Sequence, residues 1–350
     1  SQRAKIQALL ERYGMLDCRP VSTPLDHRQK LVYSPPTTAA EEAAVVKAAN
    51  NNGRSNRYKT YAHVVKAVRE IIGSIGHLAC WGRPDVRHSI YMLARYQERP
   101  TADTWQLLWR HLRYLKGTQD LTLTFGLRTF DDNSPLVCMV DSDYIGSGDN
   151  CYSTTGYVYW FYGCPILCDS RKQTAVSTST TEAELIAASV AVKTGIYLRR
   201  LLQLDFGLDG RTSSDGSVPI ILPPTPCGED NQGAMDVARG GGKHRKLRHI
   251  RVADSYIYQG ILRGECTLHY VRSADNVSDI FTKAADPETF RRLRWYLMGD
   301  APNNEDARYT RTDRMKFFWP VSRDGKSTVE ECWRKVLGVS SHILDLPVLT

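Results

Sequence analysis

Four carboxylates stand at positions where a sheet can gather acidic side chains. Two of them, Asp141 and Asp230, end or follow an expected strand. The other two, Glu184 and Asp279, lie in the first turn of an expected helix. Strand ends and helix starts can meet at one edge of a mixed sheet. We therefore expect the four side chains to converge on one point.

Clustered carboxylates repel one another and need cations to stay ionised together. Oxygen ligands without an accompanying Cys or His set favour Mg²⁺ or Mn²⁺. Two such ions can activate a water and stabilise the leaving oxygen of a phosphodiester. The chemistry that this pattern predicts is that of a nuclease.

Each acid also has a local structural interpretation. Thr181 and Glu184 have the spacing of a capping box, and Asn276 and Asp279 resemble one. Asp230 followed by Asn is an ordinary helix start. From position alone, the acids can be either metal ligands or helix caps.

The charge of the chain is unevenly distributed. The sequence has 350 residues and a net charge of +8, and residues 1–120 hold 19 Lys and Arg against 10 Asp and Glu. This length favours two domains, of which the first is basic and the second nearly neutral. A basic module suits a polyanion such as nucleic acid, although simple solubility explains it equally well.

No apolar run is long enough to span a membrane, and the nine cysteines show no zinc-ligand spacing. An intracellular, reducing location is expected.

The basic N-terminal part is predicted to be helical. Helices are expected over 1–17, over 61–79, and, after a break at residues 83–85, to about 97. A further helix is expected over 103–116, capped by Thr101 or Asp103. Residues 34–57 are expected to form a surface insertion around a short Ala-rich helix. Basic residues lie on the polar side of helix 103–116 and either meet phosphates or form a solvated face. They are Arg110, Arg113 and Lys116.

The pattern changes after a polar link at 128–135. Strands are expected over 136–140, 156–162, 165–168, 219–222 and 267–271. A long helix is expected over 181–204, with further helices over 233–239, over 250–260 and from Asn276 onward. Antiparallel strands followed by alternating helices and strands imply a mixed sheet covered by helices.

Local motifs in both parts resemble one family in the same order. The motifs of the first part are YGMLDCRPVSTPL (13–25), EIIGSIGHLACWGRPDV (70–86) and RHLRYLKGT (110–118). Those of the second part are VDSDY (140–144), STTGYVYW (153–160), SRKQTAVSTSTTEAELIA (170–187), EDNQGAM (229–235), HRKLRHI (244–250) and ADNVSDIFTKA (274–284). Together they resemble the distal part of a copia-type LTR retrotransposon polyprotein, Pseudoviridae-like, over roughly residues 1–298.

The resemblance implies a domain plan. Residues 1–127 correspond to a mainly helical thumb and connection fragment of reverse transcriptase, and 128–135 to a linker. Residues 136–298 correspond to an α/β ribonuclease H-like domain, a mixed sheet with flanking helices. Residues 299–350 form an unassigned C-terminal extension.

The resemblance also implies an activity. It makes Asp141, Glu184, Asp230 and Asp279 the catalytic ligands of two Mg²⁺ or Mn²⁺ ions. The implied reaction is cleavage of the RNA strand of an RNA–DNA hybrid, leaving a 3′-hydroxyl and a 5′-phosphate. His249 is a weaker candidate for proton transfer or product release, and a histidine in a basic solvated turn is an equally good interpretation.

Residues 239–251 include six Arg or Lys and no acid, which suits contact with the hybrid backbone. The candidates there are Lys243, Arg245, Lys246 and Arg248, beside the three basic residues of helix 103–116. Hybrid recognition rests on groove shape, 2′-hydroxyls and phosphates, so little sequence specificity is expected. The remaining reverse transcriptase and integrase parts of the element are further expected partners, in the cytoplasm, a virus-like particle or the nucleus, and no membrane is expected.

Two departures from the family pattern bear on function. The chain has no Y-x-D-D element, so we expect no DNA synthesis from this chain alone. Pro226 lies just before Asp230 and removes a backbone donor, which could displace that acid. A catalytically inactive relic that binds nucleic acid or a polymerase is therefore the alternative to an active nuclease. A DDE-type transposase is disfavoured because the order of the acids is Asp, Glu, Asp, Asp.

Overall fold

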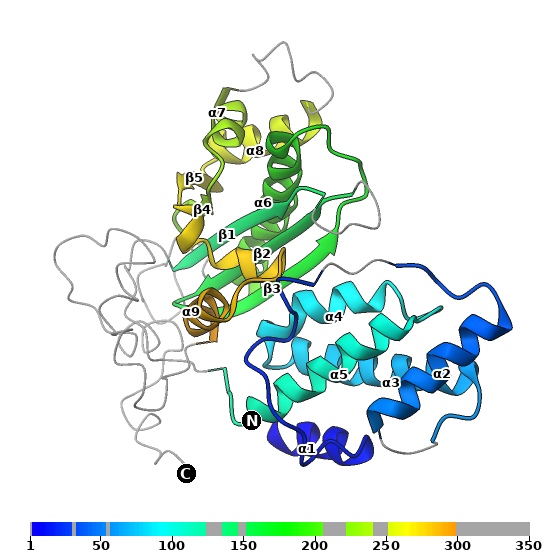
Figure 1. Cartoon of the computed structure of the whole chain (residues 1–350). Coiled ribbons are helices and arrows are strands. Elements are labelled where there is room, and N and C mark those ends of the chain that lie inside the picture. The colour runs from blue at the N-terminus through cyan, green and yellow to red at the C-terminus, as the bar shows by residue number, and fades with distance from the viewer. Residues whose placement is uncertain are drawn as a thin grey trace, which may run out of the picture.

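The structure is a computed structural model and describes residues 2–29, 33–53, 57–123, 135–145, 152–205, 222–240 and 251–298. A helical part precedes a part built on a sheet, and the two lie side by side (Figure 1). Among the described residues, none of the helices has the length and apolar character needed to cross a membrane. The seven cysteines within the described ranges are free thiols.

The helical part follows the predicted pattern. Its elements are α1 (Arg3–Arg12), α2 (Ala39–Gly53), α3 (Tyr61–Cys80), the 3₁₀ turn η1 (Pro84–Val86), α4 (Arg87–Ala94) and α5 (Ala102–Gly117). Thr101 begins α5 with a capping box, in which its hydroxyl accepts from the Thr104 amide at 3.1 Å. The choice left open between Thr101 and Asp103 is thus resolved in favour of Thr101.

The Ala-rich helix expected within residues 34–57 is present as α2, but it is not confined to the surface. Helix α2 packs against α3 and α5, and its Val45 and Ala49 belong to the hydrophobic core. The Asn50 side chain also bonds both backbone groups of Tyr58, each at 2.9 Å. The segment forms a helix of 15 residues because alanine has the highest helix propensity. Its small side chains let the helix lie close against its neighbours.

The second part contains one five-stranded mixed sheet. Its strands are β1 (Leu136–Asp143), β2 (Thr154–Phe161), β3 (Cys164–Lys172), β4 (Thr225–Glu229) and β5 (Cys266–Tyr270), in the order β3-β2-β1-β4-β5. The pairs of β1 with β2 and of β2 with β3 are antiparallel, whereas β1, β4 and β5 run parallel. The predicted fold class, a ribonuclease H-like mixed sheet with flanking helices behind a mainly helical fragment, is confirmed.

The two faces of the sheet are covered by different helices. Alternate residues of β1 point to opposite faces, so Cys138 and Val140 pack under α6 (Thr180–Asp205) while Met139 faces the other way. Two further helices lie on the α6 side, α7 (Gln232–Gly240) and α8 (Arg251–Leu262). The opposite face carries the 3₁₀ turn η4 (Val277–Phe281) and α9 (Pro287–Met298). A short 3₁₀ turn, η3 (Ser273–Asp275), precedes η4.

The described residues differ from the sequence predictions in two places. The strand that ends before Asp230 is β4, which was not expected, whereas of the strand expected over 219–222 only Leu222 lies within the described residues. Strand β4 contains Pro226, and its pairing with β1 begins after that residue, at Cys227. The single last helix expected from Asn276 is two elements, the turn η4 and then α9.

One hydrophobic cluster joins the two parts. It includes helical residues such as Trp105 and Tyr114, sheet residues such as Trp160, and Phe290 and Leu293 of α9. The Phe290 ring stands edge-on to Tyr114 at 5.8 Å between centroids. Helix α9 therefore completes the core of helices that precede it by more than 170 residues.

A largely buried polar network lies at the same place, and we call it the junction cluster (Arg83, Asp85, Tyr114, Thr118 and Arg294). Arg83 donates two hydrogen bonds to the Asp85 carboxylate, at 2.9 and 2.8 Å, and two more to Thr118. The Tyr114 hydroxyl donates to Asp85 at 2.5 Å and accepts from Arg294 at 3.1 Å. Every charge in this network has an opposite charge or a hydrogen bond beside it.

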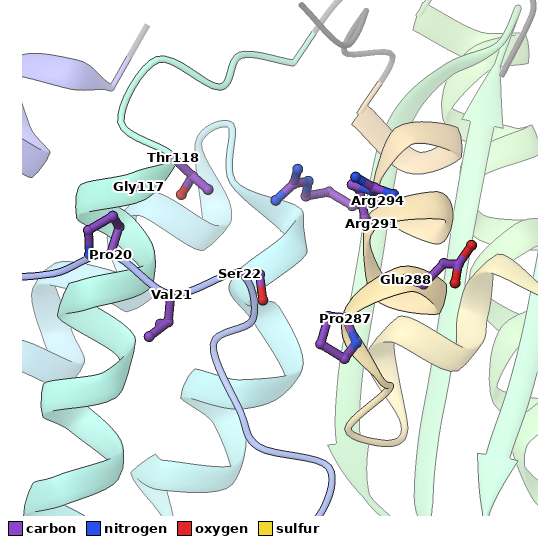
Figure 2. A pocket seen from close by; sticks show the side chains of 9 residues that line it. All are labelled: Pro20, Val21, Ser22, Gly117, Thr118, Pro287, Glu288, Arg291 and Arg294. Carbon is purple, nitrogen blue, oxygen red and sulfur yellow. The ribbon is translucent and has the colours of Figure 1, made fainter. Parts of the chain in front are cut away.

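A pocket of about 610 Å³ opens next to the junction cluster (Figure 2). Its walls come from residues 20–22, from the end of α5 at Gly117 and Thr118, and from α9. Arg291 and Arg294 project from α9 beside it. None of the predicted catalytic acids lines this pocket.

Candidate metal centre

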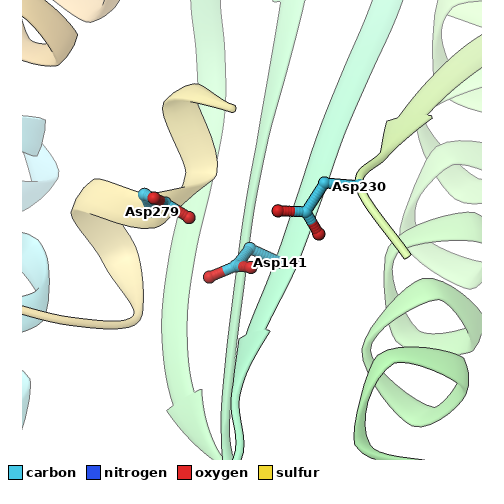
Figure 3. A group of neighbouring side chains, drawn as sticks. All are labelled: Asp141, Asp230 and Asp279. Carbon is cyan, nitrogen blue, oxygen red and sulfur yellow. The ribbon is translucent and has the colours of Figure 1, made fainter. Parts of the chain in front are cut away.

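Three of the four predicted acids meet at one edge of the sheet (Figure 3). Asp141 lies on β1, Asp230 directly follows β4, and Asp279 lies in η4. One carboxylate oxygen of each lies within 4.8 Å of those of the other two. Figure 3 shows Asp141 between the other two side chains. Asp141 and Asp279 are buried and Asp230 is half-buried.

The fourth predicted acid belongs to an adjoining group. Oxygens of Glu184, Glu229 and Asp230 also lie within 4.8 Å of one another. Asp230 is thus common to both groups, which together form the metal centre (Asp141, Glu184, Glu229, Asp230 and Asp279). The sequence analysis overlooked Glu229, although it stands beside Asp230 at the end of a strand.

The parallel pairing of β1 and β4 places the central acids. Cys138 pairs with Cys227 and Met139 with Gly228, so the same register extended by two residues brings Asp141 opposite Asp230. Gly228 has no room for a side chain, because a Cβ there would lie 2.7 Å from Val271 Cγ2, just after β5. The position of Asp230 in the metal centre gives no support to its displacement by Pro226.

The turn η4 reaches the sheet edge through three contacts. The Asn276 side chain donates to the Val140 carbonyl at 2.9 Å, one residue before Asp141. The Thr282 hydroxyl donates to the Asp141 carboxylate. Gly156, which pairs with Asp141 across β1 and β2, leaves room for the turn, because a Cβ there would lie 2.6 Å from Thr282 Cγ2. These contacts set Asp279 beside Asp141.

The acids of the metal centre were also considered as helix caps. Neighbouring residues supply these caps instead. Glu182 accepts hydrogen bonds from the Thr178 amide and hydroxyl at the start of α6. Asn231 caps α7 by accepting from the Ala234 amide at 3.0 Å. Asn276 accepts from the Ser278 amide at 3.2 Å at the start of η4. Glu184, Asp230 and Asp279 are therefore not needed as caps.

Only one cation among the described residues forms an ion pair with the metal centre. Lys283 Nζ lies 2.9 Å from Asp279 Oδ1 and 4.0 Å from Asp141 Oδ2. These two carboxylates raise the pKa of Lys283 against the opposing effect of burial, so the side chain stays charged. The sequence analysis overlooked this residue as well, although it lies in the quoted motif ADNVSDIFTKA.

Burial and mutual repulsion make the acids weak. Burial, followed by the charge of Asp141, raises the pKa of Asp279 to about 7. Burial, followed by Glu229 and Asp141, raises the pKa of Glu184 to about 11. The pKa of Asp141 and that of Glu229 are also raised, chiefly by burial. A cluster in this state favours any cation that can enter it.

The donor set fits a divalent metal ion. All five candidate ligands are carboxylates, the oxygen donors that Mg²⁺ and Mn²⁺ prefer. The Oε2 atoms of Glu184 and Glu229 are buried and accept no hydrogen bond from any described residue. Buried polar atoms are usually bonded, so these two oxygens are available as metal ligands.

The predicted nucleic-acid contacts are only partly within the described residues. Arg110 donates to Thr23 Oγ1 at 2.9 Å, and Arg113 to the Arg19 carbonyl at 2.7 Å, so both hold the N-terminal segment against α5. Lys116 is half-buried in the last turn of the same helix. Residues 241–250 lie outside the described ranges, and with them Lys243, Arg245, Lys246, Arg248 and His249.

Comparison with known proteins gives a consistent set of relatives. The chain is 30% identical over 290 residues to the retrovirus-related Pol polyprotein from transposon TNT 1-94 of Nicotiana tabacum, covering 83% of this chain and 19% of that protein. It is 30% identical over 294 residues to the Pol polyprotein from transposon RE2 of Arabidopsis thaliana, covering 84% and 17%. The chain therefore spans less than a fifth of the length of these relatives. No family model matches the chain.

Among solved structures, the chain is similar to the N-terminal ribonuclease H domain of a Mycobacterium tuberculosis protein fused to maltose binding protein. That match has a TM-score of 0.28 and 12% identity and covers 45% of this chain and 95% of that one. The fold class rests on the strand order and register rather than on a match at this score.

Proposed function

Because the chain belongs to the Pol polyproteins of copia-type retrotransposons, we propose that it is a ribonuclease H that cleaves the RNA strand of RNA–DNA hybrids. The observation that carries this proposal is the convergence of Asp141, Asp230 and Asp279 within 4.8 Å. Those residues hold the metal, with Glu184 beside them. The reaction is hydrolysis of a phosphodiester that uses two divalent cations.

When bound, Mg²⁺ supplies the positive charge that polarises the scissile phosphate and lowers the pKa of an attacking water. The protein fixes the ligands: Asp141 is held by Thr282, and Asp279 by the turn that Asn276 ties to β1. Because β1 and β4 are rigid paired strands, the ligands need little reorganisation during the reaction.

The substrate is proposed to contact basic residues from both parts of the chain. Residues 239–251, with Lys243, Arg245, Lys246 and Arg248, are one proposed contact. Lys116 of α5 is the other proposed contact. Arg110 and Arg113 of the same helix are proposed to contact the substrate through guanidinium donors that their existing bonds do not use. His249 is proposed to assist proton transfer or product release. We propose that the protein acts in the cell with the remaining reverse transcriptase and integrase parts of the element.

The test is cleavage of a labelled RNA–DNA hybrid with and without Mg²⁺. Asp141→Asn removes one ligand charge and keeps the acceptor for Thr282. Asp236→Asn, an exposed acid on α7, is the matched control for the same chemical change. The proposal expects cleavage of the RNA strand by the wild-type and Asp236→Asn proteins and none by Asp141→Asn.

Two other results would contradict it. Equal cleavage by all three proteins would show that the activity comes from a contaminant. Binding of the hybrid without cleavage by a folded wild-type protein would favour the inactive relic.

A further inference from the structure

Glu229 occupies the most enclosed position in the metal centre. Only 1% of the residue is exposed, at the last position of β4, between β1 and β5. One of its oxygens, Oε1, accepts from the Asn231 amide at 3.2 Å. The other, Oε2, is buried and accepts no hydrogen bond from any described residue. It lies in the group that includes Glu184 and Asp230.

Glu184, a member of the same group, has a second unsatisfied oxygen. Its Oε2 is also buried without a hydrogen-bond partner among the described residues, and the residue is 6% exposed. Leaving a buried acceptor unsatisfied is costly, and more so when the group is charged. Two such oxygens beside a third carboxylate are oxygen donors of the kind that a divalent cation takes.

Counter-charge is distributed unequally across the metal centre. Lys283 forms ion pairs with Asp279 and Asp141, at the outer group. Glu184, Glu229 and Asp230 form no ion pair within 4.0 Å with any described basic residue. The inner group therefore has three carboxylates and no neutralising side chain in the part of the chain that the structure describes.

We propose that Glu229 is a metal ligand, which forms an inner site for a divalent cation with Glu184 and Asp230. This deepens the proposed function and rests on it for the catalytic role of the ion, although not for its binding. The outer cation then lies among Asp141, Asp230 and Asp279, and Asp230 contributes to both sites. Five carboxylates, one more than the resemblance assigns, serve two ions.

A competing account places a proton instead of a metal ion between Glu184 and Glu229. Two carboxylates in contact can share a proton and remain buried without any cation. The two accounts differ in what Glu229→Gln does to metal binding. Gln keeps an oxygen that can accept the hydrogen bond from the Asn231 amide, and it removes the negative charge.

The experiment is a titration of the full chain with Mn²⁺ alone, at pH 7.5, with free Mn²⁺ measured by electron paramagnetic resonance. The wild type should bind two ions. Glu229→Gln should weaken one of them by about 10-fold or more, and Glu184→Gln should weaken the same one. Asp279→Asn should weaken the other ion, Asp230→Asn both, and the exposed control Asp236→Asn neither. A rise in melting temperature with Mn²⁺, reduced in Glu229→Gln, gives a second measure.

The proposal is overturned if Glu229→Gln, folded by circular dichroism, binds Mn²⁺ with the number and affinities of the wild type. Absence of hybrid cleavage by the wild type, with the Mn²⁺ pattern as expected, would defeat the proposed function and leave the metal site standing. The converse result would defeat the role of Glu229 alone.

Discussion

Two clusters of buried ionisable groups lie in this chain, and they are built on opposite plans. In the junction cluster the Arg83 and Asp85 side chains have 0% exposure and neutralise one another. In the metal centre five carboxylates share a single ion-paired cation among the described residues, Lys283. Burial is similar in the two places, whereas the charge balance is not.

The balance of charge around each buried acid decides whether its pKa rises or falls. Burial favours the neutral form of Asp85, but Arg83 and the donated hydrogen bonds outweigh it and lower the pKa of Asp85. In the metal centre nothing outweighs burial, and the pKa of Asp279 rises to about 7. A satisfied cluster stabilises the fold by itself, and an unsatisfied one needs a ligand.

The largest expected effect is on the junction cluster. Asp85→Asn leaves the Arg83 guanidinium buried without its counter-charge, and removal of one partner of a buried ion pair costs about 3–5 kcal/mol. We expect a loss of that size in the free energy of unfolding by urea. The exposed variant Asp236→Asn should change it by less than about 0.5 kcal/mol. An equally small change for Asp85→Asn would show that the junction cluster does not hold the two parts together.

The second expected effect, on the metal centre, has the opposite pattern. Asp141→Asn should lower hybrid cleavage by at least about 100-fold, since even residues that only support a metal ligand contribute about 10–100-fold. In EDTA the same variant should be no less stable than the wild type, because one repelling charge is gone. A loss of stability as large as that of Asp85→Asn would remove the distinction between the two clusters.

The third expected effect is a dependence of stability on pH in EDTA. Glu184, with a folded pKa of about 11, binds a proton that the unfolded chain releases above its ordinary pKa, so stability falls as pH rises. The slope is at most about 1.4 kcal/mol per pH unit for each such group.

The measurement is urea unfolding between pH 7 and 8.5, above the range in which His88 and His111 change charge, since burial lowers the pKa of both. Glu184→Gln should reduce the slope, and Mn²⁺ should reverse the loss of stability. A slope that is unchanged in Glu184→Gln would assign the pH dependence to other groups.

The smallest expected effect comes from Lys283, which shares two carboxylates with the outer cation. Lys283→Met should lower the Mg²⁺ concentration for half-maximal cleavage by up to about 5-fold. The effect is small because this side chain is 41% exposed and such ion pairs contribute at most about 1 kcal/mol. A higher Mg²⁺ requirement in Lys283→Met would show that the lysine supports the metal rather than competing with it.

The sequence patterns predicted most of the fold. Apolar periodicity located α3, α5 and α6, and β-prone runs located β1, β2 and β3. The sequence did not predict β4, since a proline inside an interior strand is unusual. The chain tolerates Pro226 because the recorded pairing with β1 starts one residue later.

The metal centre was predictable only in part. Strand ends, helix starts and family motifs indicated Asp141, Glu184, Asp230 and Asp279. Capping patterns suggested local roles for three of them, Glu184, Asp230 and Asp279, which neighbouring residues fill instead. Glu229 and Lys283 depend on tertiary placement. The first depends on the parallel register of β1 and β4, and the second on the turn η4 crossing the sheet beside Gly156. Neither placement is encoded in local spacing.

The position of α9 has a consequence for how the chain folds during synthesis. The bond from Arg294 to Tyr114 spans 180 residues. At about 5–20 residues per second, a ribosome needs roughly 10–40 s to add that length. The N-terminal helices therefore emerge with part of their apolar surface uncovered and complete their core only when α9 arrives. Contacts this distant in sequence form late, so the last described helix sets the time at which the first ones become stable.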